Sequence, residues 1–108
     1  MEKVCEVMDV AEGTMNGFTV NEKKILIANV QGTFYALDAI CTHRGGYLPD
    51  GKLSGNLVIC PVHGTQYDVT TGKVFRNVST LMKFLTGQAT DLKRYDVSIE
   101  GDSIFIDI

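Results

Sequence analysis

The chain has 108 residues, a length that suits one compact domain rather than two. Hydrophobic residues make up 44%, which excludes a disordered chain. There are 10 Lys and Arg against 13 Asp and Glu, giving a formal net charge of −3. This acidic balance argues against a nucleic-acid partner, because phosphate binding needs a basic face. The apolar runs are too short for a membrane span or a signal peptide, so we expect a cytoplasmic protein.

Short β segments dominate the predicted secondary structure, because apolar and polar residues alternate along most of the chain. A tight turn at Gln31-Gly32 and a turn at 100–102 predict two hairpins. Strands are expected at 4–10, 24–30, 33–37, 95–99 and 104–108. Residues 79–87 predict two turns of helix instead, with candidate N-caps at the start, apolar residues at helical spacing, and Gly87 at the end. These patterns indicate a small, all-β antiparallel domain with one insertion.

Three cysteines are too few for a disulfide scaffold, and two of them lie beside the only two histidines. The pairs are Cys41-Thr42-His43, with Gly45 and Gly46 shortly after it, and Cys60-Pro61-Val62-His63, with Gly64 next to it. Two thiols and two imidazoles in two such loops indicate a metal centre. Cys5 lies in an expected strand far from both loops and is predicted to be a buried apolar residue.

The ligand set alone does not name the metal. Zinc accepts two cysteines and two histidines in a tetrahedron. A [2Fe–2S] cluster with two thiolates on one iron and two imidazoles on the other accepts the same set. Structural zinc sites usually pair like ligands, whereas each loop here supplies one sulfur and one nitrogen, which favours two irons. A structural zinc-binding interaction module remains the alternative, and a nucleophilic Cys60 beside His63 is the remaining enzymatic interpretation.

Residues 41–72 resemble the cluster-binding region of Rieske-type ferredoxins, whose pattern is Cys-x-His, about 15–17 residues, then Cys-x-x-His. Four trailing positions match as well: Gly64, Tyr67, Asp68 and Gly72. The resemblance implies a small antiparallel β-sandwich, a single domain over 1–108 with an inserted cluster-binding subdomain of two loops at about 40–72. It also implies that Cys41 and Cys60 bind one iron of a [2Fe–2S] cluster, and that His43 and His63 bind the other.

The function implied by this resemblance is one-electron transfer rather than catalysis. Such proteins carry electrons from a flavin-dependent ferredoxin reductase to a terminal oxygenase or a similar acceptor. The partner is expected to dock at the histidine edges, and the acidic surface suits a basic patch on that partner. A monomer is the simple expectation for a shuttle. A redox sensor, or a carrier for a different acceptor, remains open.

The resemblance also suggests which residues adjust the reduction potential. Thr65 and Tyr67 match positions that hydrogen-bond to cluster sulfurs and so raise the potential. The positions of a loop disulfide found in respiratory members hold Gly46 and Val62, so the potential is expected below that class. For Tyr67, the alternative is a core aromatic residue with its hydroxyl at the surface. Residues 79–91 depart from the family, and we expect them to form a local cover packing its own apolar residues rather than a docking element.

Overall fold

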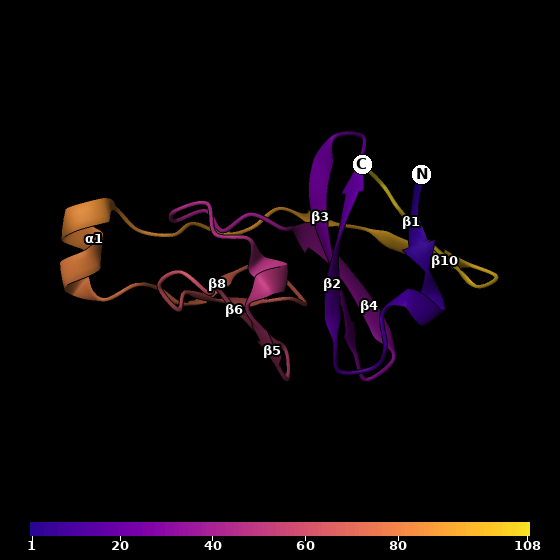
Figure 1. The fold of residues 1–108 in the computed structure, drawn as a ribbon, viewed down its shortest axis with the longest axis horizontal. Coiled ribbons are helices and arrows are strands. Elements are labelled where there is room, and N and C mark those ends of the chain that lie inside the picture. The colour runs from indigo at the N-terminus through magenta and orange to yellow at the C-terminus, as the bar shows by residue number, and fades with distance from the viewer.

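In the computed structural model, which describes residues 1–108, eleven strands form three antiparallel sheets (Figure 1). The first sheet has the order β1 (Glu2–Glu6), β11 (Ser103–Ile106) and β10 (Val97–Glu100). The second has the order β2 (Met15–Val20), β3 (Lys23–Val30), β4 (Thr33–Asp38) and β9 (Arg94–Tyr95). The third has the order β5 (Lys52–Ser54), β6 (Leu57–Ile59), β7 (Gln66–Asp68) and β8 (Val74–Arg76). This architecture confirms the predicted all-β antiparallel class.

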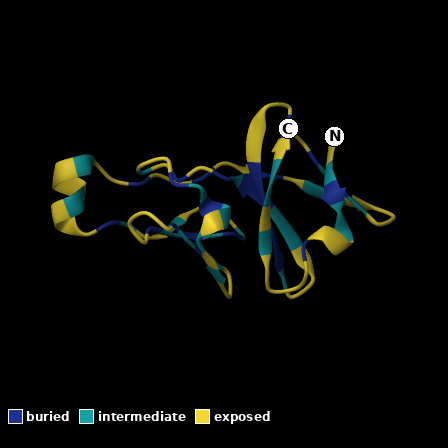
Figure 2. Ribbon diagram, in the orientation of Figure 1, coloured by how far each residue is buried: buried dark blue, intermediate teal, exposed yellow.

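The second sheet is the middle layer, and its central strand β3 is buried on both faces. Ile25 and Ile27 belong to one hydrophobic core, which includes residues of the first sheet, such as Ile104. Leu26 and Ala28 point the other way, into a second core that includes residues of the third sheet. Because successive side chains of a strand alternate between faces, a strand between two layers has apolar residues at every position. Figure 2 shows the resulting buried centre.

Most predicted strands are confirmed, with three corrections. The predicted strand 104–108 ends at Ile106 in β11. The predicted strand 4–10 ends early, since β1 stops at Glu6 and a 3₁₀ turn spans Val7–Asp9. The carboxylate of Asp9 accepts a hydrogen bond from the Glu6 N–H at 2.8 Å, and such local bonds compete with strand pairing. Tyr95 belongs to β9 beside β4 rather than to the terminal hairpin, which pairs β10 with β11.

The predicted helix is present as α1 (Thr80–Thr86), but its packing differs from the expected cover. The Ser79 side chain accepts the Met82 N–H at its start, and Gly87 follows its end with a φ of 83°. None of its residues is buried, and Phe84 is 86% exposed. The helix forms one end of a molecule measuring 47 × 27 × 20 Å, beyond the third sheet (Figure 1). It has no layer to pack against there, so the expectation of a local cover is wrong.

The insertion is closed at its base by one side chain. The Asn77 amide donates to the Ala89 carbonyl at 3.0 Å, and its oxygen accepts the Ala89 N–H at 3.0 Å. These two hydrogen bonds therefore join the segment that leads into α1 to the segment that follows it.

No helix of the structure, α1 included, is long and apolar enough to cross a membrane.

Candidate metal centre

The two Cys-His segments form loops with the same hydrogen-bond pattern. In the first loop, Cys41 N–H donates to the Gly46 carbonyl at 2.8 Å, and Gly45 N–H donates to the Cys41 carbonyl at 3.0 Å. In the second, the corresponding bonds run from Cys60 to Thr65 at 2.8 Å and from Gly64 to Cys60 at 3.1 Å. The fifth residue of each loop has a φ near +75°, the left-handed region that glycine enters without strain. The sequence thus builds two equivalent fingers.

These loops divide the four predicted ligands into a buried sulfur pair and an outer nitrogen pair. Cys41 and Cys60 are each 3% exposed, whereas His43 is half-buried and His63 exposed. The two imidazole Nδ1 atoms lie 3.3 Å apart, and the ring centroids 5.1 Å apart. Two pairs of ligands suit a centre with two metal atoms better than a centre with one.

The environment of Cys60 is arranged around its sulfur. The pKa of the Cys60 thiol is raised overall, chiefly by burial and also by the neighbouring Cys41 thiol. The N–H of Val62 acts in the opposite direction and lowers it. The N–H of His63 also lowers the pKa of Cys60. Backbone N–H groups aimed at a sulfur stabilise the thiolate, which is the form that binds metal.

The side chain of Thr65 indicates whether the residues of this site fit an iron–sulfur cluster. This side chain is fully buried, and Oγ1 has no hydrogen-bond partner. A buried hydroxyl left unpaired costs about 1–3 kcal/mol, so the position calls for an acceptor. A sulfide of a bound cluster would supply one. The residues present therefore fit a [2Fe–2S] group.

Tyr67 is also fully buried, so the alternative of a hydroxyl at the surface is wrong. Its hydroxyl oxygen lies 3.2 Å from Cys41 Sγ and 2.9 Å from Thr42 Oγ1, and it accepts the Thr42 N–H at 3.2 Å. Burial, together with the bond to Cys41, raises the pKa of Tyr67 to about 12. Thr42 Oγ1 donates in turn to the Thr90 carbonyl at 2.7 Å and accepts the Thr90 N–H at 2.9 Å.

Sequence patterns missed three threonines at this site: Thr42, Thr86 and Thr90. Thr86 Oγ1 lies 2.7 Å from His43 Nε2, and Thr90 holds Thr42. Threonine is common at surfaces and in turns, so the residue type alone does not distinguish these positions. The insertion that carries Thr86 and Thr90 is the clue that was available.

The loops approach each other closely at Gly46. A Cβ atom there would lie 2.7 Å from Val62 Cγ2 and 2.8 Å from Cys60 Sγ. Both distances are shorter than real Cβ contacts, so only glycine fits without displacing a neighbour. Gly46 and Val62 face each other, as the resemblance to disulfide-containing loops implies, but neither is a cysteine.

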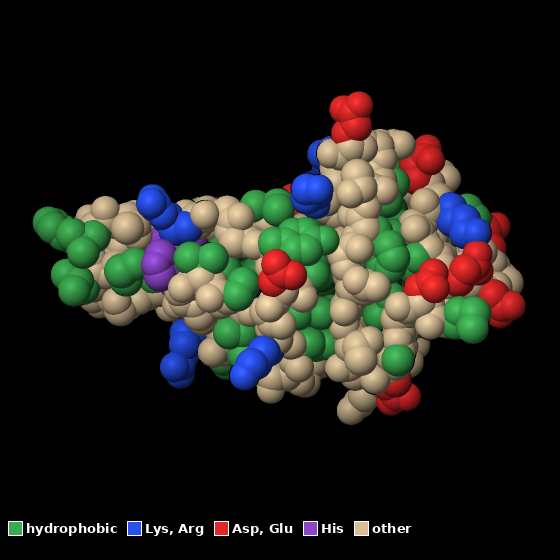
Figure 3. Space-filling view, viewed as in Figure 1, with side chains coloured by type: hydrophobic (Ala, Val, Ile, Leu, Met, Phe, Trp, Pro, Cys, Tyr) green, Lys and Arg blue, Asp and Glu red, His purple; other side chains and the backbone are tan.

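Charges are unevenly distributed along the molecule. Residues 39–92, which include both loops and α1, carry five Lys and Arg against three Asp and Glu, and the rest carries five against ten. Figure 3 shows most acidic side chains at the end away from the histidines, and apolar and basic side chains around them. The expectation of an acidic docking surface is therefore wrong for this end. The large apolar residues exposed in this range are Ile40, Val62, Phe75, Leu81, Phe84 and Leu85.

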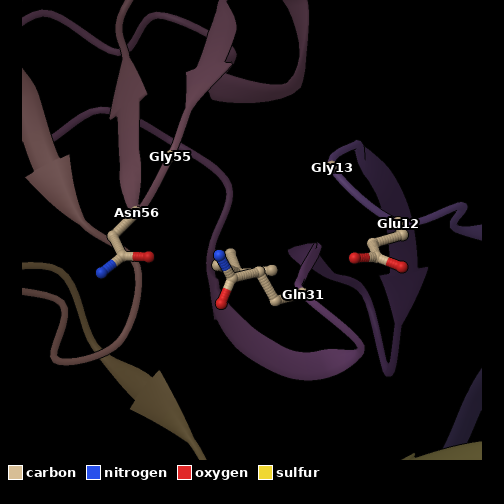
Figure 4. Close-up of a pocket in the computed structure, with 6 residues that line it drawn as sticks. Glu12, Gly13, Gln31, Gly55 and Asn56 are labelled. Carbon is tan, nitrogen blue, oxygen red and sulfur yellow. The ribbon is translucent and has the colours of Figure 1, made fainter.

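One hollow lies apart from this centre, between the β3–β4 turn and the β5–β6 turn (Figure 4). It is lined by Glu12, Gly13, Val30, Gln31, Gly55 and Asn56. It contains no histidine or cysteine, so it offers no redox chemistry of its own.

Comparison with known proteins agrees with this geometry. Residues 1–85 match the family model of the Rieske [2Fe-2S] domain. The ferredoxin component of the naphthalene 1,2-dioxygenase/salicylate 5-hydroxylase systems of Ralstonia sp. is 36% identical over 91% of this chain and 86% of its own length. The Sphingomonas yanoikuyae B1 ferredoxin has a TM-score of 0.81 at 28% identity, covering 98% of this chain and 96% of that one.

A second solved structure is a complex of reduced oxygenase and oxidized ferredoxin in carbazole 1,9a-dioxygenase. Its matching chain has a TM-score of 0.81 at 26% identity, covering 97% of this chain and 99% of that chain. These findings support the two-iron interpretation and give no support to a zinc module. The chain belongs to the Rieske [2Fe–2S] family and is an electron carrier rather than an enzyme.

Proposed function

We propose that this protein is a ferredoxin that passes single electrons from a flavin-dependent reductase to a terminal oxygenase. We assign residues 1–108 to one Rieske domain with a cluster-binding subdomain at about 40–72. The observation that carries the proposal is the separation of a buried sulfur pair from an outer pair of Nδ1 atoms 3.3 Å apart. The similar ferredoxin components of dioxygenase systems support the choice of acceptor.

Cys41 and Cys60 would hold one iron of the cluster, and His43 and His63 would hold the other. The cluster, when bound, accepts and releases one electron. The buried thiolates exclude water from the inner side, while the imidazoles face the surface. Thr65 is assigned a hydrogen bond to a cluster sulfur, since its buried hydroxyl is otherwise unpaired.

The exposed ring of His63 is the assigned exit for the electron. His43 is half-buried and its Nε2 is already bonded to Thr86, so His63 is the more accessible imidazole. An acceptor docking at this end meets apolar side chains and a small excess of positive charge. A hollow bordered by carboxylates on the oxygenase would complement that surface.

We further assign a monomer in the cytoplasm. The exposed apolar side chains of α1, namely Leu81, Phe84 and Leu85, offer an area on the order of a few hundred Å², well below the roughly 800 Å² per partner of a stable interface. Small contact areas are usual in transient electron-transfer complexes. Cys5, the one cysteine outside the metal centre, is unpaired, which suits a reducing compartment.

The experiment is an absorption spectrum of the purified protein, with iron and acid-labile sulfide measured on the same sample. A red-brown protein with two irons and two sulfides, bleached by dithionite, is the expected result. The variants Cys60→Ser and His63→Ala should lose this spectrum, whereas Cys5→Ser should keep it. A colourless protein with one zinc would overturn the proposal. Electron delivery is then measured by mixing the reduced protein with the oxidised oxygenase component of a dioxygenase system.

A further inference from the structure

A single side-chain bond connects helix α1 to the predicted metal centre. Thr86, the last residue of α1, places Oγ1 2.7 Å from Nε2 of His43. The same oxygen lies 2.9 Å from the Met82 carbonyl, one helical turn back. No hydrogen bond of this kind reaches Nε2 of His63. The two histidines therefore differ in how firmly their rings are held.

The direction of the bond follows from counting protons. A threonine hydroxyl has one proton, and the Met82 carbonyl can only accept. Thr86 therefore donates to Met82, and its oxygen accepts from His43. That leaves the His43 proton on Nε2 and a free lone pair on Nδ1. Nδ1 is the atom that faces the other histidine at 3.3 Å.

Thr86 is held in place by bonds at the base of the insertion as well as by α1 itself. The Asn77 side chain, before α1, bonds to the backbone of Ala89, after α1. Thr42 Oγ1 donates to the Thr90 carbonyl and accepts the Thr90 N–H. Thr42 directly precedes His43 in the chain. The insertion therefore contacts the ligand loop twice: Thr90 bonds to Thr42, and Thr86 bonds to the ring of His43.

We propose that Thr86 is a positioning residue for His43, selecting the tautomer that leaves Nδ1 free for iron and fixing the plane of the ring. The ligand role of His43 rests on the proposed function. An acceptor on the distal N–H makes an imidazole a better electron donor to the metal. A better donor stabilises the oxidised centre more than the reduced one, so Thr86 lowers the reduction potential.

The test compares Thr86→Val with Thr86→Ser in the cluster-loaded protein. Valine keeps the shape and removes the acceptor, and serine restores it. Thr86→Val should favour the reduced state severalfold, up to about tenfold, which for one electron equals ~59 mV. Pulsed EPR of the reduced protein should show a changed nitrogen coupling for one of the two histidines. Thr86→Ser should return both values toward those of the parent.

Thr80→Val is the matched control, because Thr80 is exposed at the other end of α1. It should leave potential and couplings unchanged. An unchanged potential and unchanged couplings in Thr86→Val would overturn the proposal, as would an equal shift in Thr80→Val. If Thr86→Val loads less iron while Thr86→Ser loads fully, the hydroxyl is needed to position His43.

The tautomer is also measured without the cluster, which separates this proposal from the proposed function. In the metal-free full-length chain, ¹⁵N NMR of His43 should show the proton on Nε2, and Thr86→Val should give a mixture of tautomers. A mixture already present in the parent chain would overturn the role of Thr86. A protein that binds zinc instead of a cluster would overturn the proposed function, whatever the tautomer.

Discussion

The hydroxyl of Tyr67 lies 3.2 Å from Cys41 Sγ and 2.9 Å from Thr42 Oγ1, so with Cys41 as a thiolate two acceptors compete for its one proton. Thr42 donates its own proton to the Thr90 carbonyl, so toward Tyr67 it can only accept. The sulfur therefore receives part of the Tyr67 hydrogen bond rather than all of it. If Tyr67 stabilises a reduced cluster as proposed, Thr42 would weaken that effect by competing for the same proton.

Tyr67→Phe is expected to lower the midpoint potential. A hydrogen bond to a ligating sulfur favours the more negative, reduced state, and its loss costs on the order of 1 kcal/mol. Redox titration of the loaded protein measures the shift. In Thr42→Val the potential should rise, because Cys41 then receives the whole bond. Adding Tyr67→Phe to Thr42→Val should abolish that rise, and a rise that persists would contradict the sharing of the proton.

Thr65→Val should have opposite effects on the metal-free and loaded proteins. Without a cluster the buried hydroxyl is unpaired, so its removal should stabilise the fold by about 1–3 kcal/mol. With a cluster the variant loses a hydrogen bond to sulfur, and the potential should fall. Urea unfolding of both forms, together with redox titration, checks the pair of results. Destabilisation of the metal-free protein would show that Thr65 has a partner of its own.

Gly46→Ala should reduce the iron content of the purified protein. Its added methyl group would lie 2.8 Å from Cys60 Sγ and 2.7 Å from Val62 Cγ2, so the second loop must move. Gly45→Asn is the control, since no atom lies within 4 Å of a Cβ there and asparagine tolerates the positive φ. Iron and sulfide assays measure both variants. Equal loading of both variants would mean that the loops separate without cost to the site.

The folded protein is expected to lose stability at alkaline pH because of the buried Cys5 thiol. Burial raises the pKa of this thiol to about 11 from a usual value near 9. Between those values the unfolded chain releases the proton while the folded chain keeps it, so the free energy of unfolding falls as pH rises. Chemical unfolding of the metal-free protein at pH 8 to 11 measures the slope. Cys5→Ala should be less stable at pH 8 but show a shallower decline, and an identical decline would assign the effect to other groups.

Changing Leu81, Phe84 and Leu85 together to glutamine should leave thermal stability nearly unchanged, because all three are more than 60% exposed. The midpoint potential should also stay the same. Electron delivery to the oxygenase should slow, if these side chains contact the acceptor. Stopped-flow mixing measures the rate. The control is Met8→Gln, since Met8 is 86% exposed in the 3₁₀ turn that follows β1, and β1 lies at the end opposite α1 (Figure 1). A parent-like rate in the triple variant would remove α1 from the docking surface.

Local patterns predicted the parts of this structure that depend on neighbouring residues. The Gln31-Gly32 hairpin, the Ser79 cap and the two glycine-bearing loops follow from short segments. Contacts between distant segments could not be predicted in this way. The bonds of His43 with Thr86 and of Thr42 with Thr90 join residues 43 and 48 positions apart. The residue type alone does not distinguish Thr86 or Thr90 from a threonine that is simply exposed to solvent.

The position of α1 shows the same difference. The spacing of its apolar residues predicted a helix correctly but also suggested a packed one, since such residues usually face a core. Its location beyond the third sheet leaves them exposed. Net charge was similarly misleading, because one total for the chain averages two ends of unlike composition.

The separation of charge along the 47 Å axis makes the molecule an electric dipole whose positive pole carries the histidines. A uniform acidic protein would be repelled by a carboxylate-lined surface, whereas a dipole is turned by it before contact is made. Toward an acceptor of that kind, the torque would turn His63 to the front during approach, so fewer encounters would present the wrong face. Because salt shortens the reach of this field to about 8 Å at 0.15 M, the aiming operates over the last steps of the encounter.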